Sequence, residues 1–200
     1  MDVSSKIHSM AGLSVAIGGL LFAANDIFFF LISADQGVTG NRTLAFAVLM
    51  IAAGLILLGF PALYAAQVDK TGYLGIVSYP LAFIGTLLVF GFAWGGVAIA
   101  PEIADEAPEF ITQGPELPLS QVMFQLHWLL IAIGYFLLGI ASFRAGVLSK
   151  WGAVILIAGS VIGLVQFAGF DSVIPVGGPL LAGIGLSIMG FSSLSRFRSG

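Results

Sequence analysis

Six long runs of apolar residues divide this chain, and connectors rich in glycine, proline and charge separate them. A helix of about 17 to 25 apolar residues crosses the hydrocarbon core of a bilayer, and each run reaches that length. The pattern predicts an all-α polytopic membrane bundle of six transmembrane helices, forming one transmembrane domain over residues 1–200. We expect the helices at about 9–33, 43–66, 73–100, 122–144, 150–171 and 177–194.

Composition supports the membrane prediction and removes several classes of protein. Hydrophobic residues make up 58% of the chain and charged residues 8%, whereas soluble domains are about half apolar and a quarter charged. Membrane lipid is therefore an expected partner. A net charge of −3 without a basic surplus argues against nucleic acid as a partner. The chain has no cysteine, which excludes disulfides and thiolate metal sites.

The connectors sort the charged residues by sign. Because Lys and Arg accumulate on the cytoplasmic side of membrane proteins, the sorting predicts that both termini are cytoplasmic, with Arg42 as an exception. The cations on the predicted inner side are Lys6, Lys70, Arg144, Lys150, Arg196 and Arg198. The acids on the predicted outer side are Asp35, Glu102, Asp105, Glu106, Glu109 and Glu116.

The longest connector is the acidic outer loop at 101–120. Its acids at 102, 105, 106 and 109 follow helical spacing and predict one face of a short helix, which Pro108 and Gly114 interrupt. The ligand spacing of a calcium loop is absent. A solvated acidic cap is therefore favoured over a cation site.

The helices repeat internally when the sequence is shifted by 80 residues. The stretch from Ile51 to Gly72 then matches the stretch from Ile131 to Gly152 at nine positions. A Gly-x4-Gly pair recurs in the second, fourth and sixth helices, where it should let each helix approach two neighbours. The repeat predicts three helical hairpins in the same orientation. Gly91-x3-Gly95 and Gly159-x3-Gly163 predict further close helix contacts.

Polar residues inside the runs are few, and a polar group at membrane depth is a functional candidate because its burial is costly. The direction of each helix places them all in the outer third of the bilayer. The candidates for a ligand or ion pocket are Asn25, Asp26, His127, Gln166 and Asp171. Helical periodicity puts Asp26, His127 and Gln166 on glycine-bearing stripes, so we expect them to point into the bundle.

Two interpretations of this cluster remain open. In the first, Asp26 and His127 form a charge pair in an outward-facing pocket that binds or transports a small polar or cationic ligand. In the second, the polar groups bond across helices only to fix packing, and the chain is a non-catalytic accessory or assembly subunit of a membrane complex. Leftover small-residue stripes would favour the second, as an interface with another copy or another membrane chain.

The sequence lacks the residue combinations that a metal site, a haem site or a catalytic site would need. His8 and His127 fall at opposite ends of the bilayer, so they cannot share a metal or haem. No catalytic constellation is evident, so we expect no enzyme activity, no metal site and no cofactor.

One segment also carries a resemblance. The stretch from Leu137 to Gly152, with Arg144, Gly146 and the pair Lys150-Trp151, resembles a cytoplasmic hairpin of small, uncharacterised six-helix bacterial integral membrane proteins. The resemblance covers mainly the fourth and fifth helices. It implies a multi-pass protein of the plasma (inner) membrane and no site residues.

Overall fold

Helices make up the regular structure of the chain, as the apolar pattern predicts. The structure, a computed structural model, describes residues 3–34, 39–106, 118–170 and 177–198. They form seven α-helices and a single turn of π-helix. The elements are α1 (Val3–Ala34), α2 (Thr39–Ala65), α3 (Val68–Ala98), α4 (Ala100–Glu106), α6 (Pro118–Ala145), α7 (Lys150–Val165), η1 (Gln166–Phe170) and α8 (Gly178–Arg198).

Six of these helices are long and apolar enough to cross a membrane, so the chain is a multi-pass membrane protein. Their spans are Lys6–Leu31, Asn41–Ala65, Val68–Ala98, Gln125–Ala145, Lys150–Ala168 and Gly178–Ser195. All six predicted helices are confirmed. The short α4 confirms the helix predicted within the acidic loop, and Glu102, Asp105 and Glu106 are exposed on it. Glu109 lies outside the described residues.

Glycines end or break the helices at two connections. Gly72 has φ 56° and interrupts α3 after its first turn, so the long helix starts at the predicted Tyr73. Gly146 has φ 61° and follows α6, where its N–H donates to the carbonyl of Ser142 at 3.1 Å. Such left-handed positions suit glycine, which has no Cβ to clash. The next helix then starts at once, capped by Ser149, which accepts from the N–H of Gly152 at 3.3 Å.

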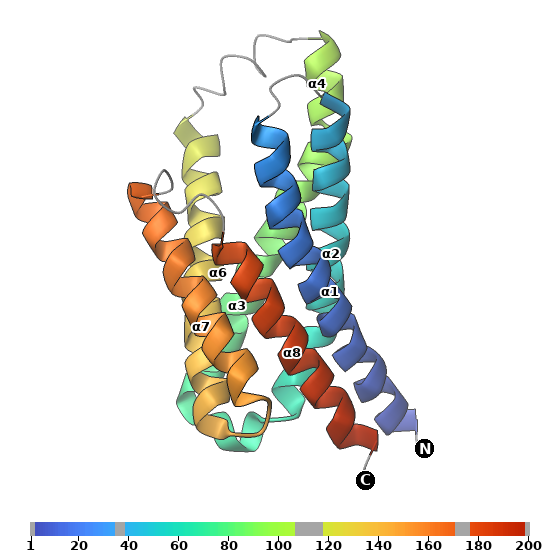
Figure 1. Ribbon diagram of the computed structural model, residues 1–200, viewed down its shortest axis with the longest axis vertical. Helices are drawn as coiled ribbons and strands as arrows, with labels where there is room; N and C mark the ends of the chain where they lie inside the picture. Colours follow the sequence, from blue (N-terminus) through green and yellow to red (C-terminus); the bar gives the residue numbers. More distant parts are fainter. Residues whose placement is uncertain (1–2, 35–38, 107–117, 171–176, 199–200) are drawn as a thin grey trace.

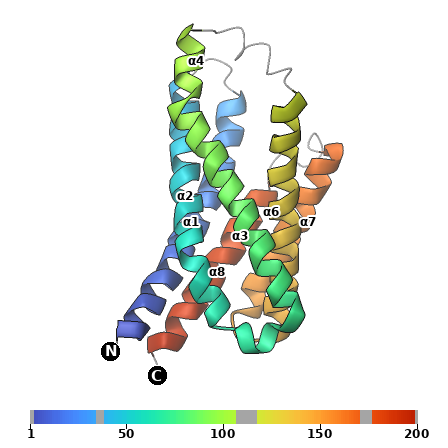
Figure 2. The same cartoon turned by 180° about the vertical axis from the view of Figure 1, so that it is seen from behind.

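The six spanning helices form a closed ring (Figures 1 and 2). Each packs against its neighbours in the order α1, α2, α3, α6, α7 and α8, and α8 packs against α1 to close the ring. Both termini lie at one end of the bundle, together with the α2–α3 and α6–α7 connections, and we call this the termini end. The opposite end, beyond which α4 extends α3, is the α4 end.

Glycine allows the closest of these contacts. A methyl group placed on Gly19 in α1 would lie 2.5 Å from the carbonyl oxygen of Gly183 in α8, so no other residue fits without movement. Ser187 adds a hydrogen bond across the same interface, from its Oγ to the carbonyl of Ala16 at 2.9 Å. Between α3 and α6, methyl groups on Gly85 or Gly134 would meet the opposite backbone at 2.6 and 2.5 Å.

The predicted glycine contacts are confirmed only in part. Gly159 packs tightly, because a methyl group there would lie 2.4 Å from the N–H nitrogen of Ala182. Gly163 also lies at a close contact, because its Cα would lie 2.9 Å from a methyl group placed on Gly178 in α8. The predictions for Gly91 and Gly95 are wrong within this chain, since no described atom of a neighbour lies within 4 Å of the position a Cβ would take. Spacing alone does not determine which side of a helix faces a neighbour, and Gly91 faces outward.

Candidate functional site

Asp26 accepts hydrogen bonds from the start of a distant helix. Its Oδ2 accepts from the N–H groups of Gly177 and Leu180, both at 3.2 Å. These bonds connect α1 to the first turn of α8. The bonds that hold the carboxylate thus come from backbone N–H groups, and not from the imidazole predicted as its partner.

The sequence at the start of α8 explains why an outside acceptor is needed. The first N–H groups of a helix have no acceptor within the helix, and a side chain at the N-cap normally supplies one. The N-cap position here is Gly177, which has no side chain, and Pro179 has no N–H. Asp26 supplies the missing oxygen from α1, and its negative charge suits the positive end of the helix dipole.

Gln166 approaches the same place from the end of α7. It is the first residue of the π-helical turn η1, and its Oε1 would lie 2.6 Å from a methyl group placed on Gly178. Gly163 lies beside it, with its Cα 2.9 Å from the same position. The structure therefore brings Asp26 and Gln166 together around the N-terminus of α8.

His127 is held by aromatic rings. It is 3% exposed, and its ring stacks on Phe92 of α3 with centroids 5.2 Å apart and an angle of 22° between the planes. The neighbouring Trp128 lies at 5.2 Å and is tilted by 38°. His127 therefore contributes to the contact between α3 and α6, whereas Trp128 lines a cavity towards α7 and α8.

Asn25 is also buried, at 3% exposure, and it precedes Asp26 on α1. Its Oδ1 has no hydrogen-bond partner among the described residues. Asp171 lies outside the described residues. Among those that are described, no three His, Asp or Glu side chains gather as they would to hold a metal ion.

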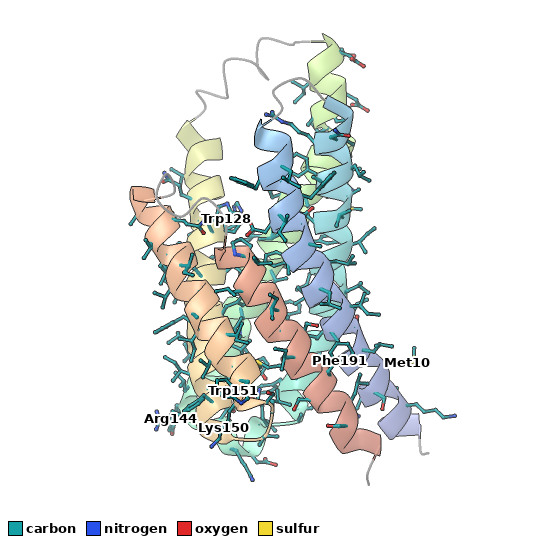
Figure 3. All side chains as sticks on the ribbon, viewed as in Figure 1. Met10, Trp128, Arg144, Lys150, Trp151 and Phe191 are labelled. Atoms are coloured by element: carbon teal, nitrogen blue, oxygen red, sulfur yellow. The ribbon has the colours of Figure 1, made fainter. Side chains whose placement is uncertain are left out.

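A small cavity lies between α1, α6, α7 and α8. It has a volume of about 30 Å³, and Phe22, Trp128, Tyr135 and Ser160 are among its lining residues. Trp128 marks its level near the start of α8 in Figure 3. The two nearest hydroxyl groups are already bonded, Ser160 to the carbonyl of Leu156 at 2.8 Å and Tyr135 to Thr86 at 2.8 Å. The volume accommodates about one or two waters, whereas sites for organic ligands measure roughly 300–1,000 Å³.

A second polar cluster, which the sequence did not predict, lies near the termini end. Gln67, which lies between α2 and α3 and is 2% exposed, donates from Nε2 to the hydroxyl of Tyr79 and to Ser142 Oγ, the latter at 3.0 Å. The only sign in the sequence was the position of Gln67 directly after an apolar run. A polar residue at that position is typical of an ordinary loop, so it did not predict a buried side chain.

Comparisons with protein-family models, with curated proteins and with solved structures give no match for this chain.

Proposed function

We propose that this protein is a non-catalytic accessory or assembly subunit of a membrane complex. The observation that carries the proposal is that Asp26 accepts hydrogen bonds from the N-terminus of α8. The carboxylate of Asp26 caps α8, and the cavity that the first turn of α8 helps to line has a volume of only about 30 Å³. A polar group that completes a helix terminus is a structural element of the bundle.

An unpartnered glycine pair supports this proposal. Gly91 and Gly95 lie one turn apart on α3, and no neighbouring atom of the described residues lies within 4 Å of either Cβ position. In lipid, helices associate where small residues let their backbones come close. The pair is left over after the ring has formed, so it suits contact with a helix of another chain.

The proposal includes a location and an architecture. We place the protein in the plasma (inner) membrane with both termini cytoplasmic, because the cations favour that side. Three repeated hairpins, α1–α2, α3–α6 and α7–α8, agree with the ring order. In the second and third hairpins, the first glycine of each Gly-x4-Gly pair meets its hairpin partner and the second meets the next hairpin. In the first hairpin the two roles are exchanged, with Gly54 facing α3 and Gly59 facing α1.

The test is native electrophoresis of the tagged protein extracted gently from its own membranes. We expect migration as a complex larger than the monomer. Replacing Gly91 and Gly95 by Leu should release the monomer, whereas Ala158→Leu, at an exposed position of α7, should not. A wild-type protein that runs as a monomer would contradict the proposal.

Binding or transport of a small polar or cationic ligand is the second candidate. The observation in its favour is the buried Oδ1 of Asn25, the residue before Asp26 on α1, which has no hydrogen-bond partner among the described residues. A thermal-shift screen with small cations and polar solutes tests it. Stabilisation of the wild type that is lost in Asn25→Leu would support a ligand site. The absence of any response would leave the assembly role as the better explanation.

A further inference from the structure

Aromatic rings stand between the α2 and α3 backbones at two glycines. The nearest atom to a methyl group on Gly54 would be in the Phe90 ring, at 3.4 Å, and Gly96 faces the ring of Phe46. Between α3 and α6, by contrast, glycines face backbone. Nearer the termini end, the rings of Phe60 and Tyr79 meet at the same α2–α3 interface.

A groove of about 610 Å³ lies between α2 and α3 near the termini end. Phe60 and Tyr79 are its buried residues, and Pro61, Ile76 and Ile84 are exposed along it. All of them belong to the apolar spans Asn41–Ala65 and Val68–Ala98, so the groove opens onto the hydrocarbon of the membrane. Its volume lies within the range of roughly 300–1,000 Å³ that is typical of ligand sites.

The aromatic part of the groove is well braced. The rings of Phe60 and Tyr79 meet edge to face, with centroids 6.3 Å apart and an angle of 82°. Tyr64 meets Tyr79 at 4.7 Å. Packed rings have few rotamers to lose, so a hydrocarbon chain bound against them orders little of the protein.

Gln67 connects the groove to the charged end of the bundle. Its amide bonds Tyr79, which lines the groove, and Ser142, which lies two residues before Arg144 in the last turn of α6. Figure 3 shows Arg144 beside Lys150, near the α2–α3 connection. Lys150 is positioned by Phe143, with Nζ 5.7 Å from the ring centroid.

Positive charge predominates at this end of the groove. Lys70, Arg144 and Lys150 are all exposed on the two connections, and Asp69 is the acid among them. Basic residues beside a groove between transmembrane helices attract anionic lipid head groups.

We propose that this groove binds an anionic phospholipid, with one acyl chain between α2 and α3 and the phosphate near Lys70 and Arg144. The apolar lining selects a hydrocarbon chain, and the cations select a negative head group over a zwitterionic one. The proposal goes beyond the assembly role and does not depend on it.

Native mass spectrometry of the purified full chain, titrated with phosphatidylglycerol or phosphatidylcholine, tests the proposal. We expect the wild type to bind one phosphatidylglycerol in preference to phosphatidylcholine. Ile76→Trp fills the groove from an exposed position and should abolish retention of the lipid. Ile84→Trp does the same from the next part of the groove, in case the first variant misfolds. Ile17→Trp is the matched control, because Ile17 is exposed on α1, away from the groove.

The head group is tested separately. Lys70→Gln combined with Arg144→Gln should weaken phosphatidylglycerol binding about tenfold or more, because each cation near an anionic lipid contributes about 1 kcal/mol. Arg42→Gln, at an exposed cation near the start of α2, should change nothing. Equal binding of the two lipids would overturn the proposal. So would folded groove-filling variants that retain lipid like the wild type.

Discussion

Asp26 provides for α8 the acceptor that Gly177 lacks. We expect Asp26→Ala to destabilise the protein by about 1–2 kcal/mol, as the loss of an N-cap does, because two N–H groups lose their acceptor. Asp26→Asn should cost less, since its amide oxygen still accepts, although it lacks the charge that suits the helix dipole. Unfolding in mixed detergent measures the free energy, and hydrogen exchange at Leu180 reports the cap. An Asp26→Ala protein with unchanged stability and unchanged Leu180 protection would contradict this role.

The sequence predicted which polar side chains point into the bundle, but it did not predict the hydrogen-bond partners of Asp26. Helical periodicity predicted that Asp26, His127 and Gln166 point into the bundle, and burial or packing agrees for all three. The acceptor role of Asp26 was not predictable, because it depends on backbone N–H groups about 150 residues away. Every residue except proline has a backbone N–H group, so the sequence does not show which of these groups lack a hydrogen-bond acceptor.

Gln67 links three elements through one amide, which makes it suitable for a double-mutant cycle. We expect Gln67→Leu to cost about 1–3 kcal/mol, because the buried hydroxyls of Tyr79 and Ser142 lose their partner. Adding Ser142→Ala should cost less in the Gln67→Leu background than in the wild type. Unfolding free energies of the four proteins give the coupling. Strictly additive changes would show that the bond to Ser142 contributes nothing.

Close helix contact gives a prediction for whole elements. A methyl group on Gly183 would lie 2.5 Å from the carbonyl oxygen of Gly19, so Gly183→Ala should push α8 from α1 and cost about 1–3 kcal/mol. Gly91→Ala is the matched control on α3, where no neighbour lies within 4 Å. It should leave stability unchanged or raise it slightly, because alanine favours the helix. Thermal unfolding in detergent compares them. Equal effects of the two substitutions would contradict the α1–α8 contact.

The elements themselves followed closely from the sequence, because membrane length and hydropathy constrain them strongly. The predicted start of the long third helix at Tyr73 is confirmed, since Gly72 breaks α3 just before it. The short π-helical turn at Gln166–Phe170 was not predicted, because hydropathy does not distinguish a π-helical turn from the α-helix that it continues. The groove between α2 and α3 was not predicted either. It depends on how side chains such as Phe60 and Tyr79 pack, and hydropathy does not record that.

At the scale of the whole molecule, the order of the helices in the ring follows their order along the chain. The contact between the first and last helices does not follow from that order. Consecutive helices pack together along the chain, but only α8 against α1 closes the ring. That contact uses Gly19 and Gly183, which lie at distant positions of the sequence. The six spans return the chain to the end where it began, and the closure sets its first and last helices side by side there (Figure 1).

The side of the membrane on which that end lies can be tested cleanly, because the chain has no cysteine of its own. A single cysteine at Lys70 or Lys150 probes the termini end, and one at Arg42 or Glu102 probes the other end, all from exposed positions. If the cations mark the cytoplasmic side, a membrane-impermeant maleimide should label intact cells at 42 and 102 only. Labelling at 70 and 150 should appear once the membrane is permeabilised. The opposite pattern would reverse the orientation and would place the proposed lipid head group in the outer leaflet, while leaving the ring and its contacts unchanged.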